Sequence, residues 1–184
     1  ATSGCLRGEI PCALSKGDWD GARRIAADYV DMYGRENFYI ELMDHGIQEQ
    51  TGMNTMLIKL AQELDLKLVA TNDVHYLDAG DAAPHDVLLC IQMGKTLDDP
   101  NRMKFGSDQF YLKSPDEMEA VWRHYPEAMR NTLEIAEKCN VELDLKTYHL
   151  PTFPIDQDKY PGMDEAAYLE KLCYDNLPRC YGEN

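Results

Sequence analysis

Asp73 and His75 stand two residues apart in the stretch LVATNDVHY (68–76), directly after a short apolar run. Side chains at positions i and i+2 of an extended backbone project from the same side, so a carboxylate and an imidazole would point together. Both groups are common ligands of zinc and of other divalent cations. The spacing therefore indicates half of a metal site. An ordinary capping Asp and a buried, hydrogen-bonded His would give the same pattern, because a D-x-H pair alone is a weak signal.

A second group of ionisable residues ends another apolar run. Glu41, Asp44 and His45 lie in or just after FYIELM (38–43), which brings two carboxylates and an imidazole to one strand end. The local sequence around Cys5 shows no partner for a metal site, and a free cysteine is most often a small buried hydrophobe.

Two strands and one helix would position these residues. Residues 38–43 and 68–72 read as strands, and residues 53–64 between them carry a helical apolar face. The order helix, strand, helix, strand requires crossover connections and hence neighbouring parallel strands. Functional side chains in such α/β folds gather at the carboxyl ends of the strands.

The rest of the chain is read from caps, prolines and apolar periodicity. Helices are expected at 11–14, 18–33, 81–91, 114–125, from 126 onward and at 164–177, with short strands at 109–113 and 141–145. The last helix has an apolar face with little after it to bury that face. It is therefore expected to pack poorly and to leave apolar side chains exposed.

Composition limits the classes of function. The 184 residues include 18 basic and 33 acidic ones, a net charge of -15, whereas a free-standing nucleic-acid binder normally shows the opposite balance. Acidic surface suits cation binding, a basic partner or simple solubility. The 6 cysteines include no C-x-x-C pair, which favours reduced thiols in the cytoplasm. No secretory leader and no run of membrane-spanning length is apparent.

Six stretches resemble the bacterial DNA polymerase III alpha subunit family, in the order of that family. They are GCLRGEI (4–10), FYIELMDHG (38–46), LVATNDVHY (68–76), HDVLLCIQMGKTLDDPNR (85–102), FYLKSPDEM (110–118) and NTLEIAEKCNVEL (131–143). One departure is Gln48, where the family commonly has proline. The resemblance covers nearly the whole chain.

The resemblance implies an α/β fold: a partial, distorted (β/α) barrel of the polymerase-and-histidinol-phosphatase (PHP) type with a C-terminal helical extension. Residues 1–77 would be the C-terminal part of the barrel and 78–147 the remainder of the PHP domain, with helices and short strands. Residues 148–163 would be a proline-containing linker, and 164–184 the first helix of the polymerase core.

The resemblance also implies a ligand set. Cys5, Asp73 and His75 match metal-ligand positions of the family, whose other ligands would lie before Ala1. Glu41, Asp44 and His45 match no ligand position, so a role in supporting the ligands is expected for them. The implied cofactors are divalent metal ions, zinc above all, with manganese, iron or magnesium as alternatives.

The implied parent protein is a DNA-directed DNA polymerase of the bacterial replisome in the cytoplasm. Its PHP site could hydrolyse 3′-terminal phosphodiesters by metal-generated hydroxide, which would give proofreading. It could instead be a non-catalytic platform that stabilises the polymerase or docks a separate proofreading exonuclease. A free-standing PHP-type phosphatase is a third reading, for which residues 105–184 would be superfluous. DNA and other replicase subunits are the expected partners of the parent protein, with no membrane. The fragment alone is expected to be inactive.

Overall fold

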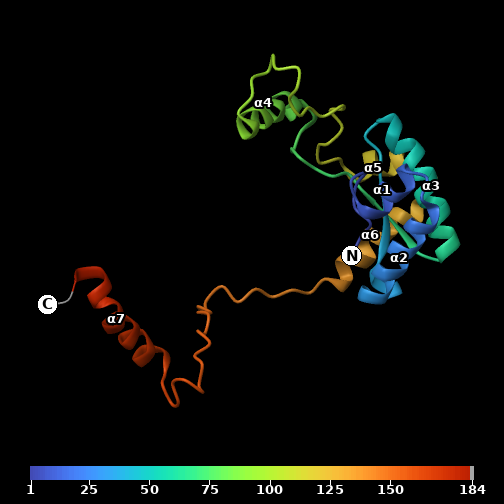
Figure 1. Cartoon of the computed structure of the whole chain (residues 1–184). Coiled ribbons are helices and arrows are strands. Elements are labelled where there is room, and N and C mark those ends of the chain that lie inside the picture. Colours follow the sequence, from blue (N-terminus) through green and yellow to red (C-terminus); the bar gives the residue numbers. More distant parts are fainter. Residues whose placement is uncertain (183–184) are drawn as a thin grey trace. The chain divides into compact units, whose positions relative to one another are not determined.

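The computed structural model describes residues 1–182 and divides the chain into two compact units, residues 1–140 and residues 141–184 (Figure 1). The last two residues of the predicted segment 164–184 lie outside the described residues. The predicted metal-site residues and their supporting candidates all belong to the first unit.

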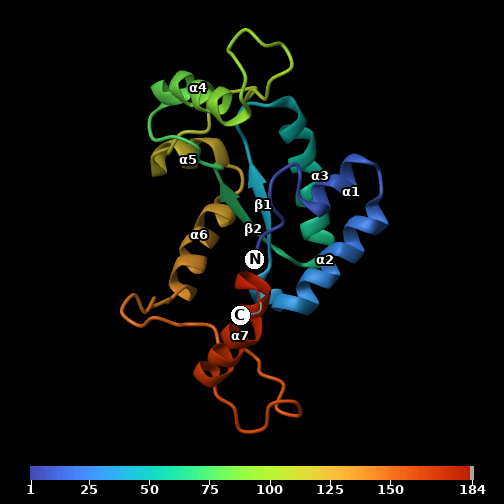
Figure 2. The same cartoon turned by 60° about the vertical axis from the view of Figure 1, so that its left-hand side comes forward.

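The first unit holds a two-stranded sheet between two groups of helices. Figure 2 shows β1 and β2 side by side, with α6 next to β2 and with α1, α2 and α3 on the opposite side. The elements in chain order are α1 (Glu9–Ser15), α2 (Trp19–Tyr33), η1 (Arg35–Asn37), β1 (Tyr39–Met43), α3 (Gln48–Leu64), β2 (Lys67–Thr71), η2 (Ala79–Asp81), α4 (Ala82–Met93), α5 (Pro115–Trp122) and α6 (Pro126–Lys138).

The strands β1 and β2 are parallel neighbours, as the order of elements predicts. Tyr39 pairs with Lys67 and Met43 with Thr71, and α3 makes the crossover between them. Their carboxyl ends therefore lie at the same edge of the sheet. The α/β class is confirmed. Within the described residues the sheet has two strands, so the barrel remains a prediction.

The apolar core lies where these strands meet α1, α2, α3 and α6. All five residues of β1 are buried, which suits a strand covered on both faces. The largest fully buried apolar side chains are Ile10, Phe38, Ile40, Leu42 and Leu60. This core gives the polar residues at the strand ends a rigid support.

The predicted helix starts are confirmed by their capping contacts. Oδ1 of Asp18 accepts a hydrogen bond from the N–H of Gly21 at 2.8 Å, at the start of α2. Ser114 and Glu117 form a reciprocal capping box at the start of α5. Both α5 and α6 begin with proline, whose missing N–H costs nothing in the first turn.

The two predicted short strands, 109–113 and 141–145, are wrong. In the first, only Tyr111 forms an isolated bridge, with Tyr76, because the carbonyl oxygens of Gln109 and Tyr111 accept hydrogen bonds from the side chain of Asn72. Residues 141–145 are exposed and have no strand beside them within residues 1–182, so no ladder can form.

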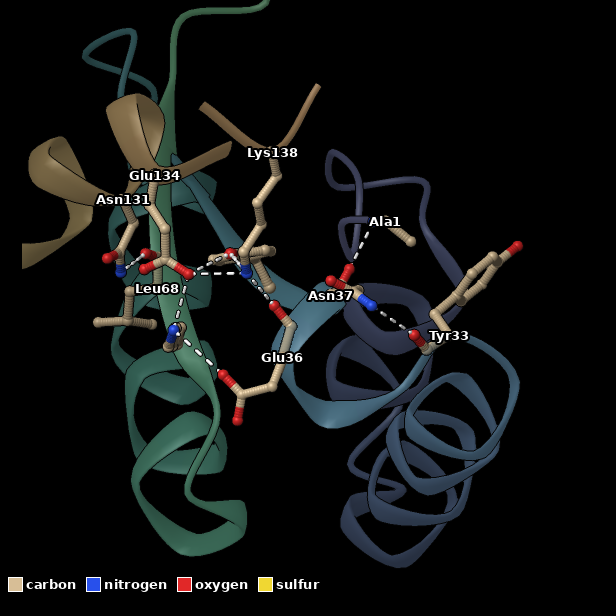
Figure 3. A network of polar contacts seen from close by, with 10 residues as sticks. Ala1, Tyr33, Glu36, Asn37, Leu68, Asn131, Glu134 and Lys138 are labelled. Carbon is tan, nitrogen blue, oxygen red and sulfur yellow. Dashed lines mark hydrogen bonds and ion pairs between the residues drawn. The ribbon is translucent and has the colours of Figure 1, made fainter. Parts of the chain in front are cut away.

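A polar network fixes α6 to the amino ends of both strands (Figure 3). The carboxylate of Glu134 accepts hydrogen bonds from Lys138 at 2.8 Å, from Lys67 at 2.7 Å and from the hydroxyl of Tyr39 at 2.9 Å. These bonds, above all the one from Lys138, lower the pKa of Glu134 to about 2. Glu134 therefore stays ionised over the whole neutral range and holds helix and sheet together.

The second unit contains α7 (Glu165–Tyr181) among its described residues. Oδ1 of Asp164 accepts a hydrogen bond from the N–H of Ala167 at 2.8 Å, as the predicted cap requires. No residue of this helix is buried, and Leu169 and Leu177 are 62% and 45% exposed. Within the described part of the second unit, nothing covers the apolar face of α7. None of the described helices is both long and apolar enough to cross a membrane.

Candidate functional site

Asp73 and His75 lie together in the turn that follows β2. Nε2 of His75 is 3.5 Å from Oδ1 of Asp73, and the two side chains are 35% and 41% exposed, respectively. Both groups can therefore be reached from solvent while they face each other. The predicted pairing of carboxylate and imidazole at the end of a buried strand is confirmed.

The two residues meet through a turn, whereas the spacing argument assumed extended backbone. Asp73 has φ +41°, a left-handed conformation that Asp tolerates better than most residues. The main chain after Asp73 is hydrogen-bonded to residues 110–112. The N–H of His75 donates to the carbonyl of Phe110 at 2.8 Å, and the N–H of Leu112 donates to the carbonyl of Tyr76 at 3.1 Å. Main-chain contacts therefore set the position of the pair.

His45 is buried between the ends of the two strands. Its Nε2 lies 2.9 Å from the carbonyl oxygen of Asn72, and its Nδ1 lies 2.8 Å from Nε2 of Gln50. Because a carbonyl can only accept, Nε2 carries the proton and Nδ1 accepts from the Gln50 amide. The ring stacks on Phe110 with 3.8 Å between centroids. His45 therefore has no free nitrogen for a metal, and it contacts the residue before Asp73.

Glu41 and Asp44 are used in local hydrogen bonds. The Glu41 carboxylate is buried and accepts from the hydroxyls of Thr2 and Thr71, both at 2.6 Å. Oδ1 of Asp44 accepts from the N–H of Gly46 at 2.9 Å. Neither carboxylate shares a hydrogen bond with Asp73 or His75. A supporting role for these two residues stays a prediction.

Cys5 lies in the turn before α1. The N–H of Gly8 donates to the Cys5 carbonyl at 2.8 Å, and a side chain at Gly8 would come within 2.3 Å of the Ser3 carbonyl oxygen, so the turn needs glycine there. The exposed Cys5 lines a small cavity of about 10 Å³ together with Glu41 and Met43. Cys5 thus approaches the carboxyl end of β1.

The structure does not bring Cys5 together with Asp73 and His75. Within residues 1–182, no group of three or more His, Cys, Asp or Glu residues could hold a metal ion. Cys5 lies beside β1, whereas the pair turns away from the end of β2. The role of these residues as ligands stays a prediction.

Sequence reasoning missed several residues around the pair. The sequence predicts Asn72 only as the last residue of a strand. A polar side chain buried at a strand end needs hydrogen-bond partners, and this need could have drawn attention to Asn72. Ser107 donates its hydroxyl hydrogen to the carbonyl of His45 at 2.6 Å. The rings of Phe105 and His85 lie 4.8 and 5.5 Å from the ring of His75. Because Ser107, Phe105 and His85 lie outside the D-x-H motif, no local sequence pattern links them to the pair.

Lys113 is a cation close to the carboxyl end of β2. Its Nζ donates to the carbonyl of Gln109 at 2.5 Å and lies 3.4 Å from Oδ1 of Asn72 and 4.2 Å from the centroid of the Tyr111 ring. Partial burial lowers the pKa of Lys113, and nearby carboxylates, of which Glu117 acts most strongly, oppose this shift. The ammonium group of Lys113 thus links the side chain of Asn72, which precedes the pair, to the main chain of Gln109.

The pair can supply two donors to a divalent cation. One carboxylate oxygen and one imidazole nitrogen, close together and open to solvent, fit zinc or a similar metal in donor chemistry. A zinc site uses three or four protein ligands. The pair therefore fits part of a metal site, and the remaining donors have to come from elsewhere.

Comparison with known proteins gives the family. The PHP domain family matches residues 1–45. The DNA polymerase III subunit alpha of Saccharopolyspora erythraea is 42% identical over 190 residues, which cover 100% of this chain and 15% of that protein. The predicted resemblance to the DNA polymerase III alpha subunits is confirmed. The subunits of Treponema pallidum (42% identical, 95% of this chain and 15% of that protein) and Thermus aquaticus (41%, 98% and 15%) agree.

The match covers the two strands, the D-x-H motif and the helices that follow. The chain spans about 15% of the length of these alpha subunits. The Asp73–His75 pair thus lies in a segment that is similar to DNA polymerase III alpha subunits.

Proposed function

We propose that this chain acts as part of a replicative DNA polymerase III alpha subunit and carries two ligands of a metal-binding, phosphoesterase-type PHP site. One observation carries the proposal. The Asp73–His75 pair is accessible and lies at the carboxyl end of a buried parallel strand, where α/β folds place their functional groups. The similarity to alpha subunits supplies the biological setting.

We also propose that β1 and β2 belong to a distorted (β/α) barrel. Two features support this. The strands are parallel and joined by a helical crossover, and Thr2 forms a further parallel bridge with Tyr39 of β1. In the same reading, residues 148–163 are a linker and residues 164–184 begin the polymerase core.

The proposed ligands are Cys5, Asp73 and His75, and the proposed metal is zinc, with manganese, iron or magnesium as alternatives. A divalent cation held there would polarise a phosphoryl oxygen and make water a stronger nucleophile. The residues of this chain would bind and orient that cation: Asp73 through a carboxylate oxygen and His75 through a neutral imidazole nitrogen. Cys5 would have to approach from the side of β1.

A platform without hydrolysis is the second candidate, and one observation favours it. Of the three proposed ligands, only Asp73 and His75 lie together, whereas Cys5 lines a cavity beside β1. In this reading the domain stabilises the polymerase or docks a separate proofreading exonuclease. In both readings DNA and other replisome subunits of the bacterial cytoplasm are partners of the longer protein. The net charge of -15 would make DNA binding by this chain alone weak.

Hydrolysis of a primer with a frayed 3′ end separates the two candidates. The substitutions Asp73→Asn and His75→Ala are made in the intact polymerase subunit that contains this chain, with His124→Ala as a control at an exposed histidine. With zinc or manganese present, we expect DNA synthesis to persist in all variants. We expect hydrolysis to fall by more than about 100-fold in the first two only, since even outer partners of metal ligands cost about 10–100-fold.

Unchanged hydrolysis in Asp73→Asn and His75→Ala would contradict the metal site and favour the platform. The 184-residue chain by itself is expected to show no efficient hydrolysis or synthesis. Metal-dependent turnover by this chain that disappears in His75→Ala would instead show a self-sufficient site.

A further inference from the structure

Asn72 lies directly before the D-x-H motif and is almost fully buried, at 8% exposure. Its side-chain Nδ2 donates to the carbonyl oxygens of Gln109 at 3.0 Å and Tyr111 at 2.7 Å. Alternate carbonyls of an extended segment are the groups that a neighbouring strand would bind. The carboxamide of Asn72 thus takes the place of a strand beside residues 109–111.

The other polar atoms of Asn72 are also used. Its main-chain oxygen accepts the Nε2–H of His45 at 2.9 Å, and its Oδ1 lies 3.4 Å from Nζ of Lys113. The ends of β1 and β2 and residues 109–113 are therefore joined at this single residue, through its main-chain oxygen and its side chain. A buried amide with all its partners present is costly to disturb, because each lost bond leaves an unpaired group.

These contacts reach the candidate metal ligand through one residue. Phe110 lies between the two residues whose carbonyls Asn72 holds, and its own carbonyl accepts the N–H of His75 at 2.8 Å. The Phe110 ring stacks on His45 at 3.8 Å and packs edge-on against His75 at 5.7 Å between centroids. If residues 109–111 move, the support of His75 moves with them.

We propose that Asn72 is the positioning residue for the Asp73–His75 pair, because its carboxamide holds the segment on which the main chain of His75 rests. The relevance of this role to metal binding rests on the proposed function. The positioning itself can be measured without any metal.

Hydrogen exchange of the His75 amide in the 184-residue chain tests the positioning. Asn72→Asp keeps the size of the side chain and its contact with Lys113 but removes both N–H donors. We expect exchange at His75 to speed up by about tenfold or more, since the supporting hydrogen bonds are lost. The matched control is Asn131→Asp, which removes a donor to the carbonyl of Leu68, 2.7 Å away at the other end of β2 (Figure 3). This control should leave exchange at His75 within about twofold.

Manganese titration, followed by broadening of the His75 imidazole resonances, tests the link to the proposed site. Asn72→Asp should need about tenfold more Mn²⁺ for the same effect, a loss typical of residues that orient metal ligands, and Asn131→Asp should need no more than the unmodified chain. If Mn²⁺ leaves His75 of the unmodified chain unaffected, the proposed metal site fails. The exchange result then still decides whether Asn72 positions the pair.

Equal exchange at His75 in Asn72→Asp and in the unmodified chain would overturn the proposal. If Asn72→Asp does not fold, the unmodified chain gives a second test. The side-chain NH₂ protons of Asn72 should exchange much more slowly than those of Asn140, an exposed residue that donates to the carbonyl of Glu137. Equal exchange of the two amides would mean that the carboxamide does not hold residues 109–111.

Discussion

An Asp and a His follow each of the two strands, yet the two pairs have opposite surroundings. After β1, His45 is 1% exposed and both of its ring nitrogens have partners. After β2, the side chains of His75 and Asp73 are 35% and 41% exposed and face each other. One imidazole is therefore a structural part of the strand ends, and the other is available to a ligand.

The comparison shows that residue type and position at a strand end do not decide a role. What separates the two histidines is how many of their polar atoms already have partners. Gln50 and the main chain of Asn72 occupy the ring of His45, whereas the left-handed turn at Asp73 carries the second pair out of the core. The buried imidazole supports the accessible one through Asn72.

Removal of each imidazole should show the largest difference between the two histidines. His45→Ala should lower the free energy of unfolding by about 3 kcal/mol, because it leaves a cavity and unpaired groups at Gln50 and Asn72. His75→Ala should cost less than about 1 kcal/mol, since the side chain is partly exposed. Urea unfolding of the two variants measures the difference. Equal losses would mean that both histidines are structural.

A smaller effect is expected at Ser107, which donates to the carbonyl of His45 at 2.6 Å. Ser107→Ala should destabilise the fold by about 1 kcal/mol, the usual value of a partly buried hydrogen bond. Ser15→Ala removes a similar bond, to the carbonyl of Cys12, at an exposed site and should cost less than about 0.5 kcal/mol. If urea unfolding gives Ser107→Ala no larger effect than Ser15→Ala, the strand end after β1 is less rigid than described.

Glu134 is a second carboxylate to compare with Asp73. The two side chains are about equally exposed, but Glu134 is paired with cations. Its side chain is 32% exposed and bonded to two lysines. Because the pKa of Glu134 is lowered from 4.5 to about 2, its stabilising effect is present above the ordinary pKa and is lost as the pH falls from about 4.5 towards 2.

Glu134→Gln should therefore unfold at a lower temperature than the unmodified chain at pH 7, by a modest amount that shrinks below pH 4.5. Glu137→Gln changes an exposed carboxylate on the same helix and should have little effect at either pH. Thermal unfolding between pH 3 and pH 7 measures both variants. A difference for Glu134→Gln that does not depend on pH would contradict the ionic network as the cause.

The order and pairing of the main helices and strands could be predicted from the sequence. The parallel strands, the crossover helix, and the caps at Asp18, Ser114 and Asp164 depend on local periodicity and turn chemistry, which a short window contains. The pairing of Asp73 with His75 was predicted for the same reason, although it forms through a turn rather than through extended backbone.

The contacts around the pair could not be predicted in this way. The hydrogen bonds from Asn72 to Gln109 and Tyr111 join residues 37 and 39 positions apart, and the one from Ser107 to His45 spans 62. These bonds depend on tertiary packing, which also replaced the strand predicted at 109–113 by contacts with a side chain. The place of Cys5 beside β1 likewise follows from packing of the turn before α1.

The most direct test of the central claim is a manganese titration of the unmodified chain, with the imidazole resonances of all 5 histidines observed at once. Mn²⁺ broadens the signals of nuclei close to it. We predict that His75 broadens at the lowest Mn²⁺ concentration, that the buried His45 follows only at higher concentration, and that Asp73→Asn abolishes the preference for His75. Broadening that spares His75, or that is the same in Asp73→Asn, would contradict a cation site at this pair.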